Sequence, residues 1–185
     1  MPSNLLRSTG ALTLCAAAAV AVAQAQPVPP IKPGLWQVSV QRAVDGQATP
    51  SPGERLDNLP PEMRAKIEAG MKARGMELGA GGDMKVCHTK ESLAQGAWNR
   101  QGASCKTDVK TRSAASWTWH TSCTQPLMET DGETLFTNAE NYIVKTSSTM
   151  TMGGQARSSQ NTISAKWLGA DCGDVKPFVP PPAAK

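Results

Sequence analysis

The stretch Cys105–Cys123, CKTDVKTRSAASWTWHTSC, decides the fold class that the sequence predicts. Threonine and valine alternate with charged residues in its first part, and Trp117 and Trp119 occupy alternate positions in its last part. Successive side chains of a β-strand point to opposite faces, so both tryptophans lie on one face. A short Ser/Ala segment separates the two parts. The stretch therefore predicts two strands joined by a turn in a half-buried sheet.

Further strand patterns of the same kind occur along the chain. They are 35–41 (LWQVSVQ), 84–87 (MKVC), 132–137 (GETLFT), 141–152 (NYIVKTSSTMTM) and 157–168 (RSSQNTISAKWL). The Gly153-Gly154 pair between the last two predicts a hairpin turn. Short polar connections favour antiparallel pairing, because parallel strands need long crossovers. We therefore expect a mainly β fold, a curved or half-closed antiparallel meander of about six or seven strands.

One segment has helical periodicity. Apolar residues recur every four positions between charges, at Met63, Ile67 and Met71. This spacing predicts one amphipathic helix over about 61–75 whose apolar side packs on the sheet. The preceding segment 45–58 is rich in glycine, proline and polar residues, which predicts an exposed loop.

Residues 1–25 have the features of an export signal. Arg7 precedes the apolar run ALTLCAAAAVAVA, and the run ends in a small-x-small pattern that signal peptidase reads. We therefore expect cleavage after Ala25 and a periplasmic mature protein. The apolar run is shorter than the ~20 residues of a membrane span, so we do not expect it to anchor the chain in the membrane. Beyond the signal we expect a proline-rich lead-in (26–33), a single β-rich domain (34–177) and a loose proline-rich tail (178–185).

Four of the five cysteines remain after such cleavage: Cys87, Cys105, Cys123 and Cys172. An even number in an exported chain predicts two disulfides, and four cysteines allow three connectivities. The favoured pairing is Cys87–Cys105 with Cys123–Cys172. The alternative Cys105–Cys123, which would bridge the two strands of the central hairpin, stays open. Aromatic residues make up only 4% of the chain, so covalent bridges matter more to the stability of so thin a core.

The charge distribution limits the partners. The whole chain has a net charge of +4, and loss of Arg7 with the signal lowers it to +3. Basic residues are scattered among acids, as in 63–78 (MRAKIEAGMKARGMEL), rather than gathered in a stripe. This distribution argues against nucleic acid and against a membrane surface as partners.

Several short motifs together resemble a known family. They are Lys32–Trp36 (KPGLW), Val86–Thr89 (VCHT), the hairpin Cys105–Cys123 and Trp167–Gly173 (WLGADCG). From Lys32 to about Pro177 the chain resembles the exported Gram-negative domain-of-unknown-function 3617 family, whose members typically have a signal peptide and four similarly placed cysteines. The resemblance implies location and architecture. It implies no activity and supplies no catalytic residues.

A soft-metal site is one alternative function. Met150 and Met152 form a Met-x-Met pair on a predicted strand, and His88 is a further residue that binds metals. Thioethers suit Cu(I). Methionines two residues apart on a strand share one sheet face, however, where packing already explains them. We therefore expect no cofactor and keep copper binding as the alternative.

Catalysis has little support in the sequence. No CxxC pair occurs for thiol exchange, and no GxSxG, HExxH or phosphate-binding glycine loop is present. The chain has two histidines, and His120 alternates with Trp119, which predicts that it faces solvent. We therefore expect no enzyme activity, with an uncharacterised hydrolase as the second alternative.

Four tryptophans lie in or at the start of predicted strands: Trp36, Trp117, Trp119 and Trp167. On a curved sheet with a helix over its mouth, such residues can line a site for an apolar molecule. The simpler explanation is that they fill a core in which Phe and Tyr are scarce. The favoured function is a non-enzymatic periplasmic binding or envelope-scaffold module, whose partner is a small apolar ligand or an envelope protein.

Overall fold

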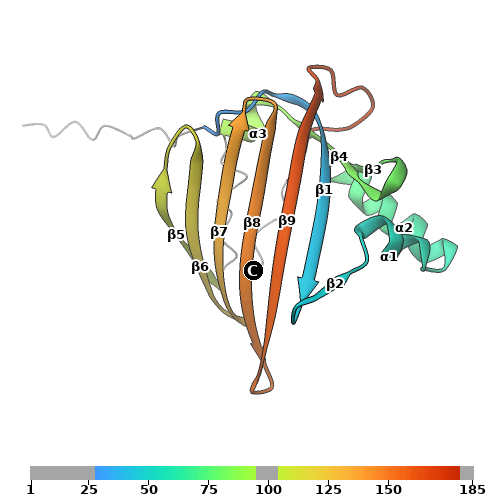
Figure 1. Cartoon of the computed structure of the whole chain (residues 1–185). Helices are drawn as coiled ribbons and strands as arrows, with labels where there is room; N and C mark the ends of the chain where they lie inside the picture. Colours follow the sequence, from blue (N-terminus) through green and yellow to red (C-terminus); the bar gives the residue numbers. More distant parts are fainter. Residues whose placement is uncertain (1–27, 95–103, 180–185) are drawn as a thin grey trace, which may run out of the picture.

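The computed structural model describes residues 28–94 and 104–179, and within them nine strands form one antiparallel sheet (Figure 1). The strands are β1 (Gly34–Val44), β2 (Gln47–Thr49), β3 (Met76–Leu78), β4 (Met84–His88), β5 (Cys105–Arg112), β6 (Ser116–Thr124), β7 (Leu127–Asn138), β8 (Asn141–Met152) and β9 (Gln155–Gly169). The predicted mainly β, antiparallel class is confirmed. The predicted number of strands is too low, because the three-residue strands β2 and β3 are too short to give an alternation pattern.

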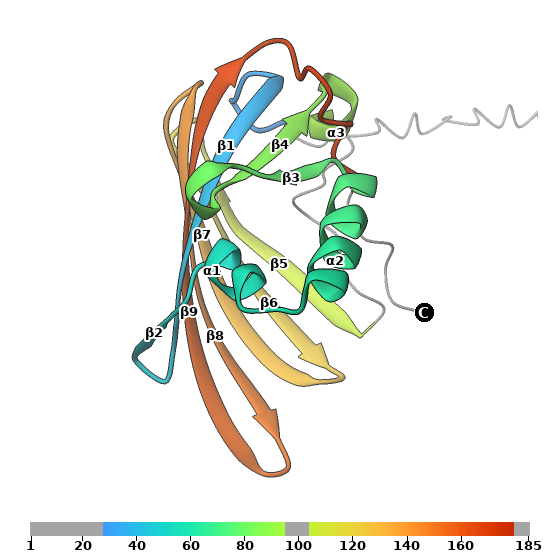
Figure 2. The same cartoon turned by 90° about the vertical axis from the view of Figure 1, so that its right-hand side faces the viewer.

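The sheet has the order β3-β4-β1-β9-β8-β7-β6-β5, with β2 paired to β1. Strands β5 to β9 follow one another as a meander, and β9 then pairs with β1 from the start of the chain. Strands β3 and β5 remain as the two edges, so the sheet is not closed. Figure 2 shows the sheet curving around the side on which helices α2 and α3 lie.

The long β8–β9 hairpin follows from two glycines. Gly153 and Gly154 have φ values of 57° and 78° and join the two strands without further residues. This conformation has little steric cost only for glycine, and its twist matches that of the flanking strands. The predicted hairpin turn is confirmed.

The concave face of the sheet divides into two parts. The upper part is the end of the sheet at which β1 begins, at the top of Figure 1. There the register aligns buried side chains on neighbouring strands: Trp36, Val38, Phe136, Tyr142 and Ala165. In its lower part the same strands carry small or polar residues: Thr130, Gly132, Thr146, Ser148, Ser159 and Asn161. Leu93 and Ile31 cover the upper part and are themselves buried.

The described residues form three α-helices, whereas one amphipathic helix was predicted: α1 (Pro52–Asp57), α2 (Pro61–Ala73) and α3 (Lys90–Ala94). Helix α2 is the predicted one, but its expected packing on the sheet is wrong. It has no buried residue, and Met63 and Ile67 are 53% and 40% exposed. Helix α1 and strand β2 lie within 45–58, which had been predicted to be a loop.

The disulfides are Cys87–Cys172 and Cys105–Cys123, so the favoured pairing was wrong and the open alternative is the one that forms. Cys105 and Cys123 are direct partners in the β5–β6 register, with their Cα atoms 4.0 Å apart. Cys87 lies opposite Leu35 of β1, and β9 ends opposite the same residue shortly before Cys172. The shared neighbour β1 therefore brings Cys87 and Cys172 together.

The predicted signal peptide and its cleavage site lie outside the described residues. Of the predicted loose tail, Phe178 donates a backbone hydrogen bond to the Cys87 carbonyl (2.8 Å) and Val179 donates one to Arg74 (3.1 Å), whereas 180–185 lie outside the described residues. Within 28–94 and 104–179, no helix has the length and apolar character needed to cross a membrane.

Candidate ligand site

An apolar pocket lies on the concave face where its upper and lower parts meet. Its volume is about 180 Å³. It is lined by Val109, Arg112, Trp117, Trp119, Thr134, Val144 and Ile163. The last three are neighbours in the register of β7, β8 and β9, and the tryptophans come from β6. Five adjacent strands therefore build the pocket, and all but two of its side chains are apolar.

Trp117 and Trp119 are held differently. Trp117 is 8% exposed, its indole N–H donates to the Ser113 carbonyl (3.1 Å), and its ring meets Phe136 edge-on with centroids 5.5 Å apart. Trp119 is only half-buried and lies against the backbone of Gly132, its register partner on β7. A Cβ atom at Gly132 would fall 2.2 Å from the Trp119 ring. The missing side chain therefore makes room for the Trp119 indole.

Arg112 reaches the pocket because of a bulge in β5. Val109 pairs with Trp119, but the next pair is Thr111 with Thr118, so Lys110 is an extra residue. An inserted residue reverses which later side chains point to a given face. Arg112 consequently pairs with Trp117 and lies on the concave face. Its guanidinium carbon is 5.3 Å from the centroid of the Trp117 ring.

The other two tryptophans of the predicted ligand face are not in this pocket. Trp36 is fully buried, with its ring centroid 5.1 Å from that of Tyr142 and its indole N–H donating to the Lys32 carbonyl (3.0 Å). Trp167 is half-buried beside it in the β1–β9 register, and Lys32 Nζ lies 4.7 Å from its ring centroid. These two tryptophans pack in and against the upper part of the core.

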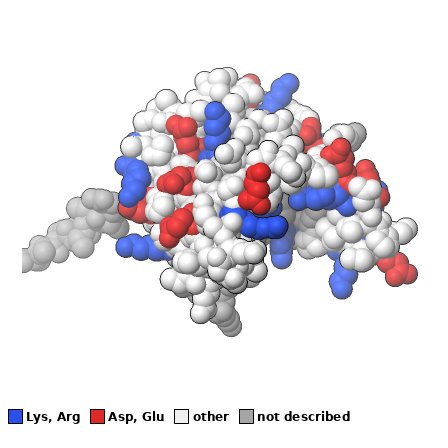
Figure 3. Space-filling model, turned by 60° about the horizontal axis from the view of Figure 1, so that its bottom comes forward, with Lys and Arg blue, Asp and Glu red and all other residues white. Residues whose placement is uncertain are grey.

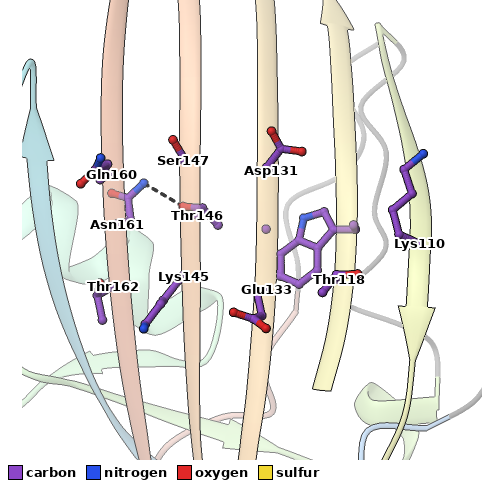
Figure 4. A pocket seen from close by; sticks show the side chains of 12 residues that line it. Lys110, Thr118, Asp131, Glu133, Lys145, Thr146, Ser147, Gln160, Asn161 and Thr162 are labelled. Carbon is purple, nitrogen blue, oxygen red and sulfur yellow. Dashed lines mark hydrogen bonds between the residues drawn. The ribbon is translucent and has the colours of Figure 1, made fainter. Parts of the chain in front are cut away.

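A larger polar hollow of about 530 Å³ borders the same strands (Figure 4). Three consecutive residues from each of β7, β8 and β9 line it, together with Lys110, Thr118 and Trp119. Charges of both signs occur there, with Lys145 and Glu133 on adjacent strands. The Asn161 amide donates to the Thr146 hydroxyl (3.1 Å), as the dashed line in Figure 4 shows. This lining suits polar groups or water better than an apolar body.

His120 lies on the opposite face of β6 from the tryptophans, as predicted, and its side chain is 34% exposed. Its Nδ1 is 2.8 Å from an Asp131 oxygen, and its Nε2 is 3.0 Å from a Glu129 oxygen and 3.3 Å from the Ser122 hydroxyl. The hydrogen bond to Asp131, with Glu129 acting in the same direction, raises the pKa of the His120 imidazole. This cluster stabilises the charged form of the imidazole.

His88 and the methionine pair do not come together. His88 lies at the end of β4 opposite Gly34, whereas Met150 and Met152 lie beyond the other end of β1 in the register. Strand β1 has 11 residues, which at ~3.3 Å per residue separates the two ends by roughly 30 Å. Burial lowers the pKa of the His88 imidazole to about 4. Within the described ranges no group of three or more His, Cys, Asp or Glu residues is arranged to hold a metal ion.

Charges of both signs are interspersed on the face of the molecule seen in Figure 3. Exposed ion pairs among the described residues include Arg64 with Asp57 and Arg64 with Glu68, both at 2.7 Å. Exposed pairs of this kind contribute little to stability, about 0–1 kcal/mol. The scattered charges of the sequence are thus also scattered in space on this face.

Sequence reasoning missed two residues that shape the site: Arg112, which lines the apolar pocket, and Gly132, which makes room for Trp119. An isolated glycine within a strand pattern signals close approach of another group, and Gly132 in ETDGETLF is such a glycine. Arg112 had no comparable signal, because the bulge that turns it toward the concave face is a property of strand pairing.

A family model described as "Protein of unknown function (DUF3617)" matches residues 31–172. The chain is also 30% identical over 112 residues to the "Uncharacterized protein in lpd-3 5'region" of Pseudomonas putida, and the match spans 57% of this chain and 77% of that relative. No solved structure matches the chain significantly.

Proposed function

Because this chain belongs to the domain-of-unknown-function 3617 family, whose description assigns no activity, we propose its function from the geometry of the pocket. The chain is a non-enzymatic periplasmic binding module that holds a small apolar ligand against Trp117 and Trp119. An envelope protein is the alternative partner.

The apolar pocket between the two tryptophans carries this proposal. Five strands provide its walls, and Trp117, Val144 and Ile163 provide apolar surface. Ligand sites are usually concave and apolar with a few polar groups, and here Thr134 and Arg112 are the polar lining residues. The scarce aromatic residues of the chain are thus used partly to line a space rather than to fill it.

The size of the pocket limits the ligand. At about 180 Å³ the pocket is below the roughly 300–1,000 Å³ of sites for drug-sized molecules. Dry apolar cavities of about 150 Å³ accept one benzene molecule. The pocket therefore suits a single ring or a short alkyl chain.

The disulfides support a periplasmic location. Both pairs, Cys87–Cys172 and Cys105–Cys123, have the proximity that a disulfide needs. Disulfides persist in oxidising compartments and are rare in the cytosol. Alkylation of free thiols in intact cells tests this part of the proposal, and we expect all four cysteines to be protected.

Two measurements test ligand binding. Native mass spectrometry of the purified protein shows whether a small apolar molecule is retained. A titration with benzyl alcohol, followed through the indole N–H signals in nuclear magnetic resonance, shows where a ring-sized molecule binds. We expect the Trp117 and Trp119 signals to shift and the Trp36 signal to stay, because Trp36 is fully buried in the upper core.

A pair of variants locates the binding. Ile163→Phe fills the pocket, and we expect it to weaken benzyl alcohol binding by at least about tenfold. Thr149→Phe adds the same ring at an exposed position on the opposite face of β8 and should leave binding unchanged. Equal binding by the two variants, or no shift of Trp117 and Trp119 in the parent protein, would refute the proposal.

Hydrolysis is a second candidate because Ser122, His120 and Asp131 form a hydroxyl–imidazole–carboxylate chain. One feature weighs against it. Glu129 lies 3.0 Å from Nε2, the nitrogen that would have to accept the Ser122 proton. Turnover of p-nitrophenyl acetate by the parent protein and by His120→Gln tests this candidate, and we expect no difference between them.

A further inference from the structure

Arg112 is the one charged side chain that lines the apolar pocket in the described part of the chain. The other residues that line the pocket, among them Trp117, Val109 and Val144, are uncharged. Charged groups are rarely placed in such surroundings without a compensating partner, because removing a charge from water is costly. The position of Arg112 therefore needs a physical explanation.

The local backbone brings Arg112 to this position. If Lys110 paired regularly instead of forming the bulge, alternation along β5 would put Thr111 on the concave face and Arg112 on the outer one. Bulges commonly occur where a side chain has to be redirected, including next to active sites. Here the bulge replaces a threonine by an arginine at the rim of the pocket.

Among the described residues, no acidic side chain pairs with the guanidinium. Its Nε is buried without a hydrogen-bond acceptor, and none of the ion pairs among residues 28–94 and 104–179 includes Arg112. The face of Trp117 offers only a cation–π contact, at 5.3 Å from the guanidinium carbon to the ring centroid. Donor capacity in the plane of the guanidinium is left for a ligand.

We infer, on the basis of the proposed function, that the ligand is a small apolar carboxylate. Its carboxylate accepts hydrogen bonds from Arg112, and its ring or short alkyl body contacts Trp117 and Trp119. The planar guanidinium presents donors in a fork that matches the two oxygens of a carboxylate. The volume of about 180 Å³ limits the body to about one ring.

The test compares three ligands with the same ring: benzoate, benzyl alcohol and benzylamine. Dissociation constants come from the shifts of the Trp117 and Trp119 indole N–H signals. Hydrogen bonds to a charged group are stronger than neutral ones, so benzoate should bind about 10- to 100-fold more tightly than benzyl alcohol. Benzylamine, a cation, should bind most weakly.

Substitution of Arg112 should remove this preference. Arg112→Met retains an apolar contact but no charge, and we expect benzoate to lose its advantage over benzyl alcohol. Arg112→Lys keeps the charge without the fork and should retain part of the preference. Arg55→Gln removes one positive charge from an exposed position on α1 and should keep all of it.

The outcomes separate this inference from the proposed function. If benzyl alcohol binds as tightly as benzoate, or if Arg112→Met leaves the preference intact, the carboxylate inference is wrong and the apolar site remains. If none of the three ligands shifts the Trp117 and Trp119 signals, the proposed function itself is wrong. Arg112→Met is expected to fold, because Arg112 is half-buried and takes part in no ion pair of the described residues.

Discussion

The upper and lower parts of the concave face are built on the same strands, yet only the upper part is packed. Strand β8 shows the change within a few residues, since Tyr142 and Val144 are buried whereas Thr146 and Ser148 are half-exposed. Both halves of the strand make regular antiparallel pairs with β7 and β9. Backbone pairing therefore continues where side-chain packing ends.

This difference separates two uses of one sheet. The upper part, covered by Leu93 and Ile31, provides the buried apolar surface that stabilises the fold. The lower part carries small or polar side chains such as Thr146 and Ser148, and the apolar pocket lies at the boundary between the two. Proteins commonly depart from full packing where a ligand has to be received.

Removing one disulfide from the upper or the lower end of the sheet should cause the largest changes in stability. Cys87–Cys172 spans 85 residues at the upper end, and Cys105–Cys123 spans 18 residues at the lower end. The chain-entropy relation gives losses of about 4.5 and about 3 kcal/mol when each pair is replaced by alanines. Urea unfolding of the two double variants measures this. Equal losses, or a larger loss at the lower end, would show that loop length alone does not set the two contributions.

The tryptophans give the next largest effect. Trp36 is fully buried and Trp119 is half-buried. We expect Trp36→Ala to lower the free energy of unfolding by about 4 kcal/mol and Trp119→Ala by about 2 kcal/mol, since the loss follows the buried area and the cavity left behind. Chemical unfolding checks both values. If Trp36→Ala fails to fold, Trp36→Phe and Trp119→Phe preserve the test, and Trp36→Phe should show the greater loss.

The sequence predicted the packed part better than the open part. Alternation around Trp36, Trp117 and Tyr142 correctly indicated strands with one buried face, and the Gly153-Gly154 pair indicated their longest hairpin. These signals are local, and each follows from the geometry of one strand or one turn. Helix α2 was found for the same reason, but its periodicity could not show that its apolar side lacks a partner.

The features that were missed depend on pairing between distant segments. The cysteine connectivity follows from the register of β5 with β6 and from the shared neighbour β1. The exposure of Arg112 to the pocket follows from a bulge. Helix α1 is the exception, because Ser51 and Glu54 form a capping box that the sequence already displayed within the predicted loop.

The two histidines should make the free energy of unfolding depend on pH in opposite directions. The pKa of His88 falls from its ordinary value of 6.5 to about 4 in the upper core. Between these values the unfolded chain binds more protons, so the free energy of unfolding should fall by up to about 3 kcal/mol as the pH drops from 6.5 to 4. Unfolding measured across this range with His88→Gln should lack that part of the decline.

His120 serves as the control for this measurement. Its pKa is raised by Asp131 and Glu129, so its contribution to stability is present at low pH and is lost as the pH rises through the raised pKa. His120→Gln should therefore retain the acid-induced decline that His88→Gln loses. A decline of the same size in His88→Gln and the parent would show that burial of His88 has no such effect.

The smallest predicted effect concerns two glycines, one in contact with the pocket wall and one in an exposed helix. Gly132 lies beneath the Trp119 ring, where a Cβ atom would fall 2.2 Å away, whereas a Cβ at Gly70 in α2 would meet nothing within 4 Å. Gly132→Ala should therefore displace Trp119 and lower the free energy of unfolding by about 1–2 kcal/mol. Gly70→Ala should raise it by about 0.5–1 kcal/mol, because alanine is favoured in a helix interior.

Benzyl alcohol titration should show weaker binding only in Gly132→Ala, since only there does a wall of the pocket move. If Gly132→Ala binds and unfolds like the parent, the Trp119 ring is not held by this contact, and the boundary between the packed and open parts of the face lies elsewhere.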